Sequence, residues 1–408
     1  MSPQPRLVVF TLLFPHAGQP NAGVFIRERM FRVGQTLPLV VVAPVPWFPG
    51  QAILRKWRPH FRPPAPFFEK QQGFAVYHPR FLSIPGLFKS LDGLFMALGS
   101  GPTLWRLKRR FGFTLIDAHF AYPDGYAATL LGKWFKVPVT ITLRGTEVRH
   151  SRRRNLRPLL LKALRRATRI FAVATALKTH VESLGIPGEK IQVVGNGVDL
   201  VKFQPIAQVE ARRQLNLPLD APMIISVGGL VERKGFHRVI DCLPTLQQRF
   251  PEIHYLIVGG PSAEGDMTAA LQQQVARLNL QAKVHFLGIL PPEQLKFPLS
   301  AADVFVLATG NEGWANVFLE AMACGLPVVT TAVGGNAEVI NKPELGYLTP
   351  FGDEPALIEA IAAALARSWD RQAIIAYAQS NTWDKRVKTL IDEFNAMMVR
   401  GKRSPPSP

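Results

Sequence analysis

Short apolar runs, many of them β-branched, alternate along the chain with longer stretches in which apolar residues recur at helical spacing. This alternation is typical of parallel strands joined by crossover helices, and it predicts an α/β fold with doubly wound sheets. The strands expected in the first half are 7–14, 39–43, 74–77, 115–118, 139–143, 170–174 and 191–194, and those in the second half are 223–227, 253–258, 284–287, 304–307 and 327–331.

The length of the chain indicates two domains, because 408 residues are too many for a single compact core. Prolines and polar residues interrupt the pattern between residues 198 and 222, where we expect a hinge. The predicted parts are an N-terminal Rossmann-like domain over 1–200, a C-terminal Rossmann-like domain over 201–375, a helix over 376–398 that packs back on the first domain, and a disordered tail over 399–408.

The composition of the chain indicates a globular protein rather than an integral membrane protein. Hydrophobic residues make up 47% of the chain, yet no apolar run reaches the roughly 18 residues that cross a bilayer. The run at 7–14 resembles a signal-peptide core, but no small-residue cleavage site follows it, so we expect a buried first strand. The two cysteines, Cys242 and Cys324, offer neither a disulfide framework nor a metal site, which fits a reducing cytoplasm.

The positive charge is concentrated in the first half of the chain. Residues 1–205 carry 30 Lys and Arg against 9 Asp and Glu, a net charge of +21, whereas the remainder carries −2. This asymmetry indicates an anionic polymer or surface as the partner of the first half, and a small ligand for the second. Basic clusters near residues 55–58, 108–111 and 152–169, the last expected as one helix, favour docking on an anionic membrane surface.

The segment from Glu312 to Thr331 predicts a loop, a helix and a buried strand. Asn316 is expected to cap the helix and Gly325 to end it, with Glu320 about one turn inside. Loops at the carboxyl ends of parallel strands line ligand sites. The N–H groups at the helix start suit a diphosphate, and the two carboxylates can accept hydrogen bonds from sugar hydroxyls. The same spacing, taken alone, also fits a capped helix with solvated glutamates.

Several motifs together resemble glycosyltransferase family 4. The Glu-x7-Glu pattern of Glu312 and Glu320 carries the resemblance with Gly313, Asn316, Ala321, Gly325, Pro327, Gly334, Gly335 and Glu338. Further similar segments are AHFAYPDGYAA at 118–128, LRGTE at 143–147, NGVD at 196–199 with Phe203 and Pro205, VGGLVERKG at 227–235, VGG at 258–260 and VHFLG at 284–288. The resemblance spans nearly the whole chain, and it is strongest to bacterial enzymes that assemble teichuronic acid, exopolysaccharide and O-antigen units.

The resemblance implies a GT-B fold, with two Rossmann-like domains facing each other across a cleft and the acceptor domain first. It implies a hexosyltransferase of cell-envelope polysaccharide biosynthesis that retains anomeric configuration. The expected partners are a nucleotide-sugar donor as co-substrate and a saccharide or polyprenyl-diphosphate-linked acceptor, with no cofactor and no metal. No Asp-x-Asp pair for a divalent ion occurs in the chain. The expected location is cytoplasmic, peripheral on the inner face of the cytoplasmic membrane.

Carried over residue by residue, the resemblance assigns His119 and Glu312 to the catalytic site. His119, at the end of the strand over 115–118, matches a histidine that contacts the sugar ring rather than acting as a base. Glu312 corresponds to the residue that binds the transferred sugar, and Glu320 to the one that binds the ribose hydroxyls. Glu147 is expected to hold local structure or form the acceptor side rather than take part in chemistry.

The donor site is completed by groups near the diphosphate. Lys234 matches the lysine that contacts it, and Asn316 belongs to the same site. Gly23, in the loop after the first strand, is expected to let the backbone approach the phosphates. Arg233 is a candidate further contact, because Gly229 stands where many members of the family carry arginine.

Three other interpretations of the sequence are possible. A GT-B epimerase or hydrolase would release free sugar without an acceptor, and a phosphorylase would need a pyridoxal lysine context that the chain lacks. Nucleic-acid binding is disfavoured because no nucleic-acid module is recognisable and the arginine-rich segment has an ordinary apolar face. A non-enzymatic nucleotide-binding module, such as one for NAD, lacks a GxGxxG motif with a following acidic residue.

Overall fold

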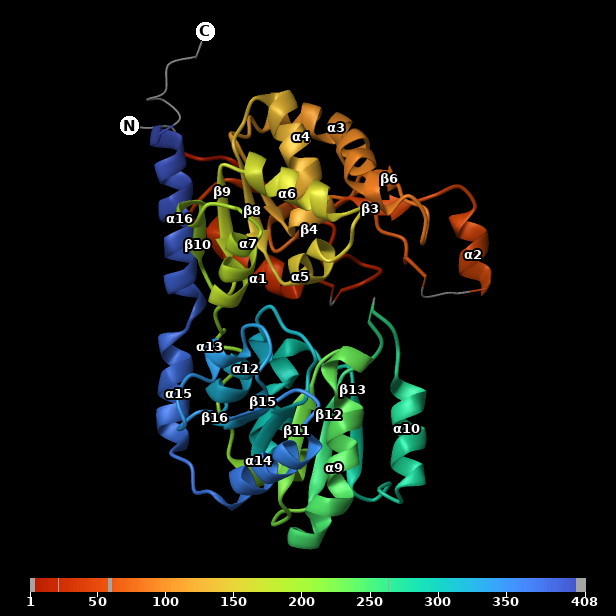
Figure 1. Cartoon of the computed structure of the whole chain (residues 1–408), viewed down its shortest axis with the longest axis vertical. Coiled ribbons are helices and arrows are strands. Elements are labelled where there is room, and N and C mark those ends of the chain that lie inside the picture. Colours follow the sequence, from red (N-terminus) through yellow and green to blue (C-terminus); the bar gives the residue numbers. More distant parts are fainter. Residues whose placement is uncertain (1–3, 21, 58–60, 263, 401–408) are drawn as a thin grey trace. The chain divides into compact units, whose positions relative to one another are not determined.

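The computed structural model describes residues 4–20, 22–57, 61–262 and 264–400. The chain forms two compact units (Figure 1). Unit 1 combines the residues up to Asn196 with those from Trp383 onward, and unit 2 comprises Gly197–Thr382. The chain therefore leaves unit 1, builds unit 2 and returns to unit 1 with its last helix.

Unit 1 is built on an eight-stranded sheet in which β4 is antiparallel to its neighbour and the other pairs are parallel. Its strands, in spatial order, are β10 (Ile191–Val193), β9 (Arg169–Ala172), β8 (Val139–Leu143), β7 (Leu115–His119), β1 (Leu7–Phe10), β2 (Leu39–Val42), β5 (Phe74–Tyr77) and β4 (Phe68–Gln71). The chain runs outward from β1 on one side and from β7 on the other. Between these two strands lies the switch point of the sheet, where ligands bind in open α/β folds.

Helices cover both faces of this sheet. Ile26 of α1 and Phe394 of α16 share one buried core with Leu7 and Val9 of β1, so the last helix packs on the unit that contains the first strand. A separate ladder pairs β3 (Val45–Trp47) with β6 (Arg80–Leu82). The helices of unit 1 are α1 (Val24–Gly34), α2 (Gln51–Trp57), α3 (Asp92–Arg110), α4 (Tyr126–Phe135), α5 (Thr146–Ser151), α6 (Arg157–Arg166), α7 (Thr175–Ser183) and α16 (Trp383–Arg400), with short turns η1 (Lys89–Leu91), η2 (Ala121–Gly125) and η3 (Gly188–Lys190).

Unit 2 contains a six-stranded, wholly parallel sheet. Its strands, in spatial order, are β13 (Val284–Gly288), β12 (His254–Val258), β11 (Met223–Val227), β14 (Val304–Leu307), β15 (Val328–Thr331) and β16 (Gly346–Thr349). The order reverses between β11 and β14, which sets the switch point of this second sheet there.

Alternate residues of β11 enter two different cores, because successive side chains of a strand point to opposite faces. Met223 and Ile225 pack with α8, α11, α12 and α15, whereas Ile224 packs with α9, α10 and α14. The sheet is therefore buried on both sides, as its nearly continuous apolar strands require. The helices of unit 2 are α8 (Gln208–Gln214), α9 (Phe236–Arg249), α10 (Thr268–Arg277), α11 (Lys296–Ala301), α12 (Asn316–Ala323), α13 (Asn336–Val339), α14 (Glu354–Ala366) and α15 (Arg371–Ser380), with turns η4 (Glu232–Lys234) and η5 (Pro292–Gln294).

The α/β fold with two largely parallel sheets is confirmed, and each expected strand is present, four of them with the expected bounds (β5, β8, β11 and β14) and the others with shifted ends. The run at 7–14 was expected to be strand throughout, but β1 ends at Phe10 and the rest is loop. The expectation of one helix over 152–169 is wrong: α5 ends at Ser151, α6 covers Arg157–Arg166, and β9 begins at Arg169. The helix that packs on unit 1 begins at Trp383, later than the expected residue 376, because α15 stays in unit 2.

The expected tail over 399–408 falls mostly outside the described residues, which end at residue 400 within α16. No helix in the described part of the chain has the length and apolar character needed to span a bilayer.

Candidate functional site

Two adjacent strands of unit 2 carry an ion pair at their carboxyl ends. Lys234 closes the short turn η4 that follows β11, and Glu312 lies in the loop that follows β14. Because β11 and β14 are neighbours at the switch point, these loops meet. The Lys234 Nζ atom lies 2.6 Å from Glu312 Oε1, and the Glu312 residue is 8% exposed. The structure thus brings together two predicted site residues that are far apart in sequence.

The same carboxylate oxygen accepts further hydrogen bonds. Arg233 Nη1 donates to Glu312 Oε1 at 3.1 Å, and the Thr309 hydroxyl donates from Oγ1 to the same oxygen at 3.3 Å. Arg233 also donates to Glu264 from Nε at 2.9 Å and from Nη2 at 2.8 Å. The pKa of Arg233 is raised, first by its hydrogen bond to Glu264 and also by the charge of Glu312. Two cations and two carboxylates therefore form a balanced network at the edge of the sheet.

The helix that follows Glu312 differs in one detail from its prediction. Asn316 was expected to cap α12 from outside, but it is the first residue of the helix, and the cap position belongs to Ala315, whose side chain has no hydroxyl or carbonyl to offer. Glu320 lies one turn further along α12 and is partly exposed. Gly325, with φ 82°, follows the helix in the left-handed conformation, as its predicted role at the helix end requires.

In unit 1, the corresponding switch point holds His119. This residue ends β7 and is fully buried. Arg144, in the loop after β8, donates to the His119 Nδ1 atom from Nε and from Nη2, each at 3.1 Å. An arginine side chain has donors only, so Nδ1 must be the acceptor and the proton of the neutral ring sits on Nε2.

Buried charges around His119 fix its protonation state. Burial lowers the pKa of His119 well below its ordinary value, and the cations Arg144 and Arg29 lower it further. Its Nε2 atom lies 3.5 Å from Asp117 Oδ2. The pKa of Asp117 is raised to about 6 by burial, although a hydrogen bond from Thr140 and the charge of Arg29 oppose the rise. At neutral pH the ring is uncharged and presents an N–H rather than a base.

Two further carboxylates hold the loops around this site. Glu147 is fully buried and accepts backbone N–H bonds from Ala121 at 3.1 Å, Arg144 at 3.2 Å and Gly145 at 2.7 Å. These bonds link the loops after β7 and β8, which agrees with its expected role in local structure. Asp124 Oδ1 accepts the backbone N–H of Leu12, joining the loops after β7 and β1.

Gly23 lies in the loop after β1, at the start of α1. Its φ is 70°, and a Cβ atom there would lie 2.4 Å from the carbonyl oxygen of Leu13. Both features require glycine, and the local turn of the backbone is enough to explain that requirement. Its expected part in binding a diphosphate stays a prediction.

Sequence reasoning missed the partners of His119. Arg144 belongs to the LRGTE segment at 143–147, but the resemblance suggests a role only for the glutamate of that segment. Asp117 and Arg29 were also overlooked. A signal was available for Asp117, because it interrupts an otherwise apolar buried strand, and a buried charge must be paired or neutralised. Arg29 gives no such signal, since polar residues are common in a surface helix.

Comparison with known proteins identifies the class of protein. Residues 207–381 match the family described as Glycosyl transferases group 1, and residues 39–202 match Glycosyltransferase Family 4. The chain is 31% identical over 306 residues to the amylovoran biosynthesis glycosyltransferase AmsK of Erwinia amylovora, covering 70% of each chain. It is 28% identical over 366 residues to TuaC of Bacillus subtilis, whose name assigns it to teichuronic acid biosynthesis, covering 87% of this chain and 88% of TuaC.

A likeness to solved structures supports the fold. The crystal structure of HepE from Anabaena in complex with UDP aligns with a TM-score of 0.72 at 21% identity, covering 96% of this chain and 100% of HepE. The two α/β units therefore have the GT-B fold. The chain belongs to glycosyltransferase family 4, and it is a transferase of glycosyl groups.

Proposed function

We propose that the protein transfers a hexose from a nucleotide sugar to a saccharide or lipid-linked saccharide acceptor in the synthesis of a cell-surface polysaccharide. In this reaction the bond from the anomeric carbon to the diphosphate oxygen breaks, a bond from that carbon to an acceptor hydroxyl oxygen forms, and the hydroxyl proton passes to the leaving nucleoside diphosphate. Support for the pathway comes from AmsK and TuaC, whose names assign them to amylovoran and teichuronic acid biosynthesis. Support for a nucleotide donor comes from HepE, which was crystallised with UDP.

The observation that carries the proposal is the pairing of Lys234 with Glu312 at the switch point of the second sheet. A cation and a carboxylate at one edge suit two adjacent parts of a nucleotide sugar, the diphosphate and the transferred sugar. The diphosphate would contact the cations of Lys234 and the adjacent Arg233, and Glu312 would accept hydrogen bonds from the sugar hydroxyls. Glu320 and Asn316, on the helix that follows, are assigned to the ribose and to the same donor site.

The leaving diphosphate acquires negative charge as the glycosidic bond breaks, and that charge must be stabilised. In the proposed mechanism the cations of Lys234 and Arg233 provide this stabilisation without a divalent ion, and the reaction retains anomeric configuration. His119 donates its Nε2–H to the sugar ring rather than removing a proton, because its ring is neutral and Nδ1 is occupied by Arg144. Gly23 is assigned to backbone contact with the phosphates.

The proposed location is the cytoplasmic face of the membrane. The excess of positive charge in residues 1–205 supports peripheral attachment to anionic lipid. Exposed arginines in the turn between α5 and α6, at Arg152, Arg153 and Arg154, are available for such contacts.

The test is to incubate the purified protein with UDP-, GDP- and ADP-sugars and to measure nucleotide release with and without polyprenyl-diphosphate-linked and water-soluble saccharide acceptors. We expect acceptor-dependent release with one class of donor. Equal release without any acceptor would instead assign a hydrolase or an epimerase-like enzyme. Absence of release with every donor would contradict the proposal.

A further inference from the structure

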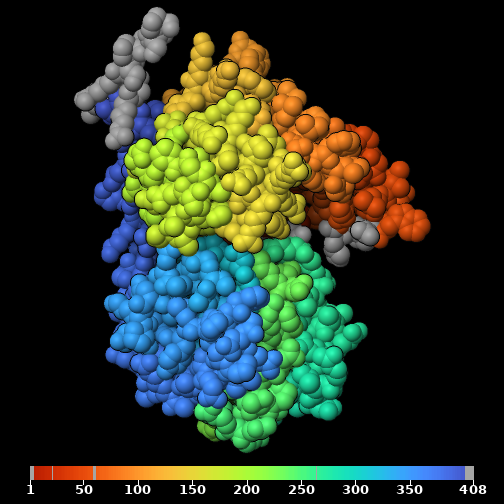
Figure 2. All heavy atoms as spheres, viewed as in Figure 1, coloured from red at the N-terminus to blue at the C-terminus, as the bar shows by residue number. Residues whose placement is uncertain are grey.

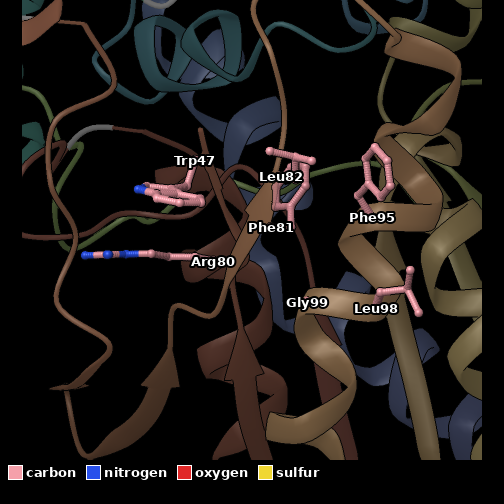
Figure 3. Close-up of a pocket in the computed structure, with 7 residues that line it drawn as sticks. All are labelled: Trp47, Arg80, Phe81, Leu82, Phe95, Leu98 and Gly99. Atoms are coloured by element: carbon pink, nitrogen blue, oxygen red, sulfur yellow. The ribbon is translucent and has the colours of Figure 1, made fainter. Parts of the chain in front are cut away.

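An apolar hollow lies in unit 1 between the β3–β6 ladder and helix α3 (Figure 3). Its volume is about 430 Å³, within the range of ligand pockets, roughly 300–1,000 Å³. Trp47 and Arg80 extend side by side from the ladder, and Phe95 and Leu98 project from α3. The described residues that line the hollow are Trp47, Arg80, Phe81, Leu82, Phe95, Leu98 and Gly99, and Arg80 carries the only charge among them.

Backbone packing builds this hollow. At Gly99 the helix approaches β6 so closely that a Cβ atom would lie 2.4 Å from the carbonyl oxygen of Arg80 and 3.0 Å from Phe81 Cβ. Trp47 and Leu82 are paired across the ladder, which places both at the same end of it. Two regular elements therefore form the walls, so the hollow belongs to the folded framework of unit 1.

The exposed face of α3 continues the apolar lining. Leu94, Leu98 and Trp105 follow one another at spacings of four and seven residues, which puts them on one side of a helix, with Leu91 just before it. Their exposed fractions are 38%, 53% and 53%. The opposite side, with Met96 and Leu104, is buried. A helix that is apolar on its core face needs no apolar residues on its outer face, so this stripe indicates an apolar partner.

The charges near the α3 stripe indicate which kind of partner binds there. The last turns of α3 carry four cations, Arg106, Lys108, Arg109 and Arg110. The one acidic residue of the helix, Asp92, is paired with Lys89 at 3.1 Å. The guanidinium of Arg80 makes no ion pair or hydrogen bond within the described part of the chain. Exposed apolar side chains bordered by unopposed cations suit a lipid with an anionic head group.

We propose that the hollow and the α3 stripe bind the hydrocarbon chain of a polyprenyl-diphosphate-linked acceptor, with Arg80 pairing with one of its phosphates. The occupant is the lipid carrier of the acceptor, so this inference rests on the proposed function. The hydrocarbon chain contacts Trp47, Phe95 and Leu98, and the remainder of the stripe lies in the bilayer surface. The acceptor is then selected by its lipid as well as by its sugar.

The experiment measures sedimentation of the full chain with phosphatidylcholine vesicles that contain either a polyprenyl diphosphate or phosphatidylglycerol at matched negative charge. We expect stronger binding to the polyprenyl diphosphate vesicles. Leu98→Ser should weaken that binding about tenfold, because a leucine loses its apolar contact. Its matched control is Leu219→Ser, an exposed leucine of unit 2, which should bind as the parent does.

A second pair of variants tests the phosphate contact. Arg80→Gln should remove the preference for polyprenyl diphosphate, whereas Arg277→Gln, an exposed arginine on α10 of unit 2, should keep it. Equal binding of the parent to both vesicle types, or unchanged binding of both Leu98→Ser and Arg80→Gln, would overturn the inference.

Nucleotide release with a water-soluble saccharide acceptor, measured on the parent protein, separates the two proposals. Release without a preference for polyprenyl diphosphate leaves the transferase function standing and removes the lipid site. Absence of release contradicts the proposed function itself, whatever the vesicles bind.

Discussion

Arg144 donates two hydrogen bonds to the Nδ1 atom of His119, from Nε and Nη2, each at 3.1 Å. The guanidinium also lies over the ring of Phe25, 4.9 Å from its centroid, so the arginine is held by α1 as well as by the histidine. This arrangement makes His119 a hydrogen-bond donor, and it makes Arg144 a positioning residue that acts through the histidine.

The first prediction concerns the protonation of His119. In the parent protein its ring should stay neutral with the proton on Nε2 throughout the pH range around neutrality, because burial and nearby cations lower its pKa. Arg144→Gln removes one of these cations and should raise the pKa of His119. Nitrogen-15 NMR of labelled histidine would report both the tautomer and the pKa. Arg153→Gln is the matched control, since that arginine acts on His150 instead; an unchanged His119 pKa in Arg144→Gln would refute the assignment.

The second prediction concerns stability and Asp124. Burial raises the pKa of this carboxyl to about 7 in the folded protein, against 3.8 as its ordinary value. Between these values the folded state holds a proton that the unfolded state has lost, so the contribution of Asp124 to the free energy of unfolding decreases as pH rises. The slope is at most about 1.4 kcal/mol per pH unit.

Asp124→Asn removes this titration while keeping an oxygen that can accept the Leu12 N–H. We expect the difference in unfolding free energy, parent minus variant, to fall between pH 4 and pH 7 and to level off above pH 7. Urea unfolding at several pH values measures it. A difference that stays constant or rises with pH would show that the carboxyl is ionised in the folded protein throughout.

The third prediction concerns the donor site. Lys234→Ala and Glu320→Ala should each weaken donor binding by about 1.5–3 kcal/mol, or roughly tenfold to a hundredfold, because each removes a charge-assisted hydrogen bond. Isothermal titration with the nucleotide that the panel identifies measures the loss. Lys342→Ala and Glu210→Ala, exposed residues of the same unit, are the matched controls. Parent-like affinity in both site variants would remove the donor site from this edge of the sheet.

The fourth prediction is that activity survives exhaustive treatment with EDTA. In the proposed mechanism Lys234 and Arg233 stabilise the leaving diphosphate, so chelation of divalent ions should leave turnover close to that of untreated protein. A control with a metal-dependent enzyme shows that chelation is complete. Activity that disappears and returns only with Mg²⁺ or Mn²⁺ would mean that the leaving group is stabilised by a metal.

The sequence predicts a structural feature well when the residues that form it are close together in the chain. Strands such as β8, β11 and β14 are short runs dominated by apolar and β-branched residues, and their predicted and observed bounds coincide. The strands β3, β4, β6 and β16 were missed, because β3 contains a proline, β4 is polar and exposed, and β6 and β16 are short and only partly buried.

The candidate site follows the same rule. Lys234, Glu312 and His119 are predicted as site residues because each lies in a local motif. The contact of Lys234 with Glu312 depends on β11 and β14 being neighbours, and the contact of His119 with Arg144 depends on β7 and β8 being neighbours. Such pairings join residues remote in sequence, and no local pattern shows which side chain completes a buried hydrogen bond.

The last prediction concerns attachment to the membrane through charge. Arg152, Arg153 and Arg154 are exposed in the turn between α5 and α6, and each cation near an anionic bilayer contributes roughly 1 kcal/mol. Changing all three to glutamate should reduce sedimentation with phosphatidylglycerol vesicles, and raising the salt concentration should reduce binding of the parent protein, since salt screens charge beyond a Debye length. The same change of charge at Arg213, Arg277 and Lys342, exposed residues of unit 2, is the matched control and should have a smaller effect. If the parent binds neutral and anionic vesicles equally, or binds neither at low salt, attachment through these charges is excluded, and the assignment as a glycosyltransferase is unaffected.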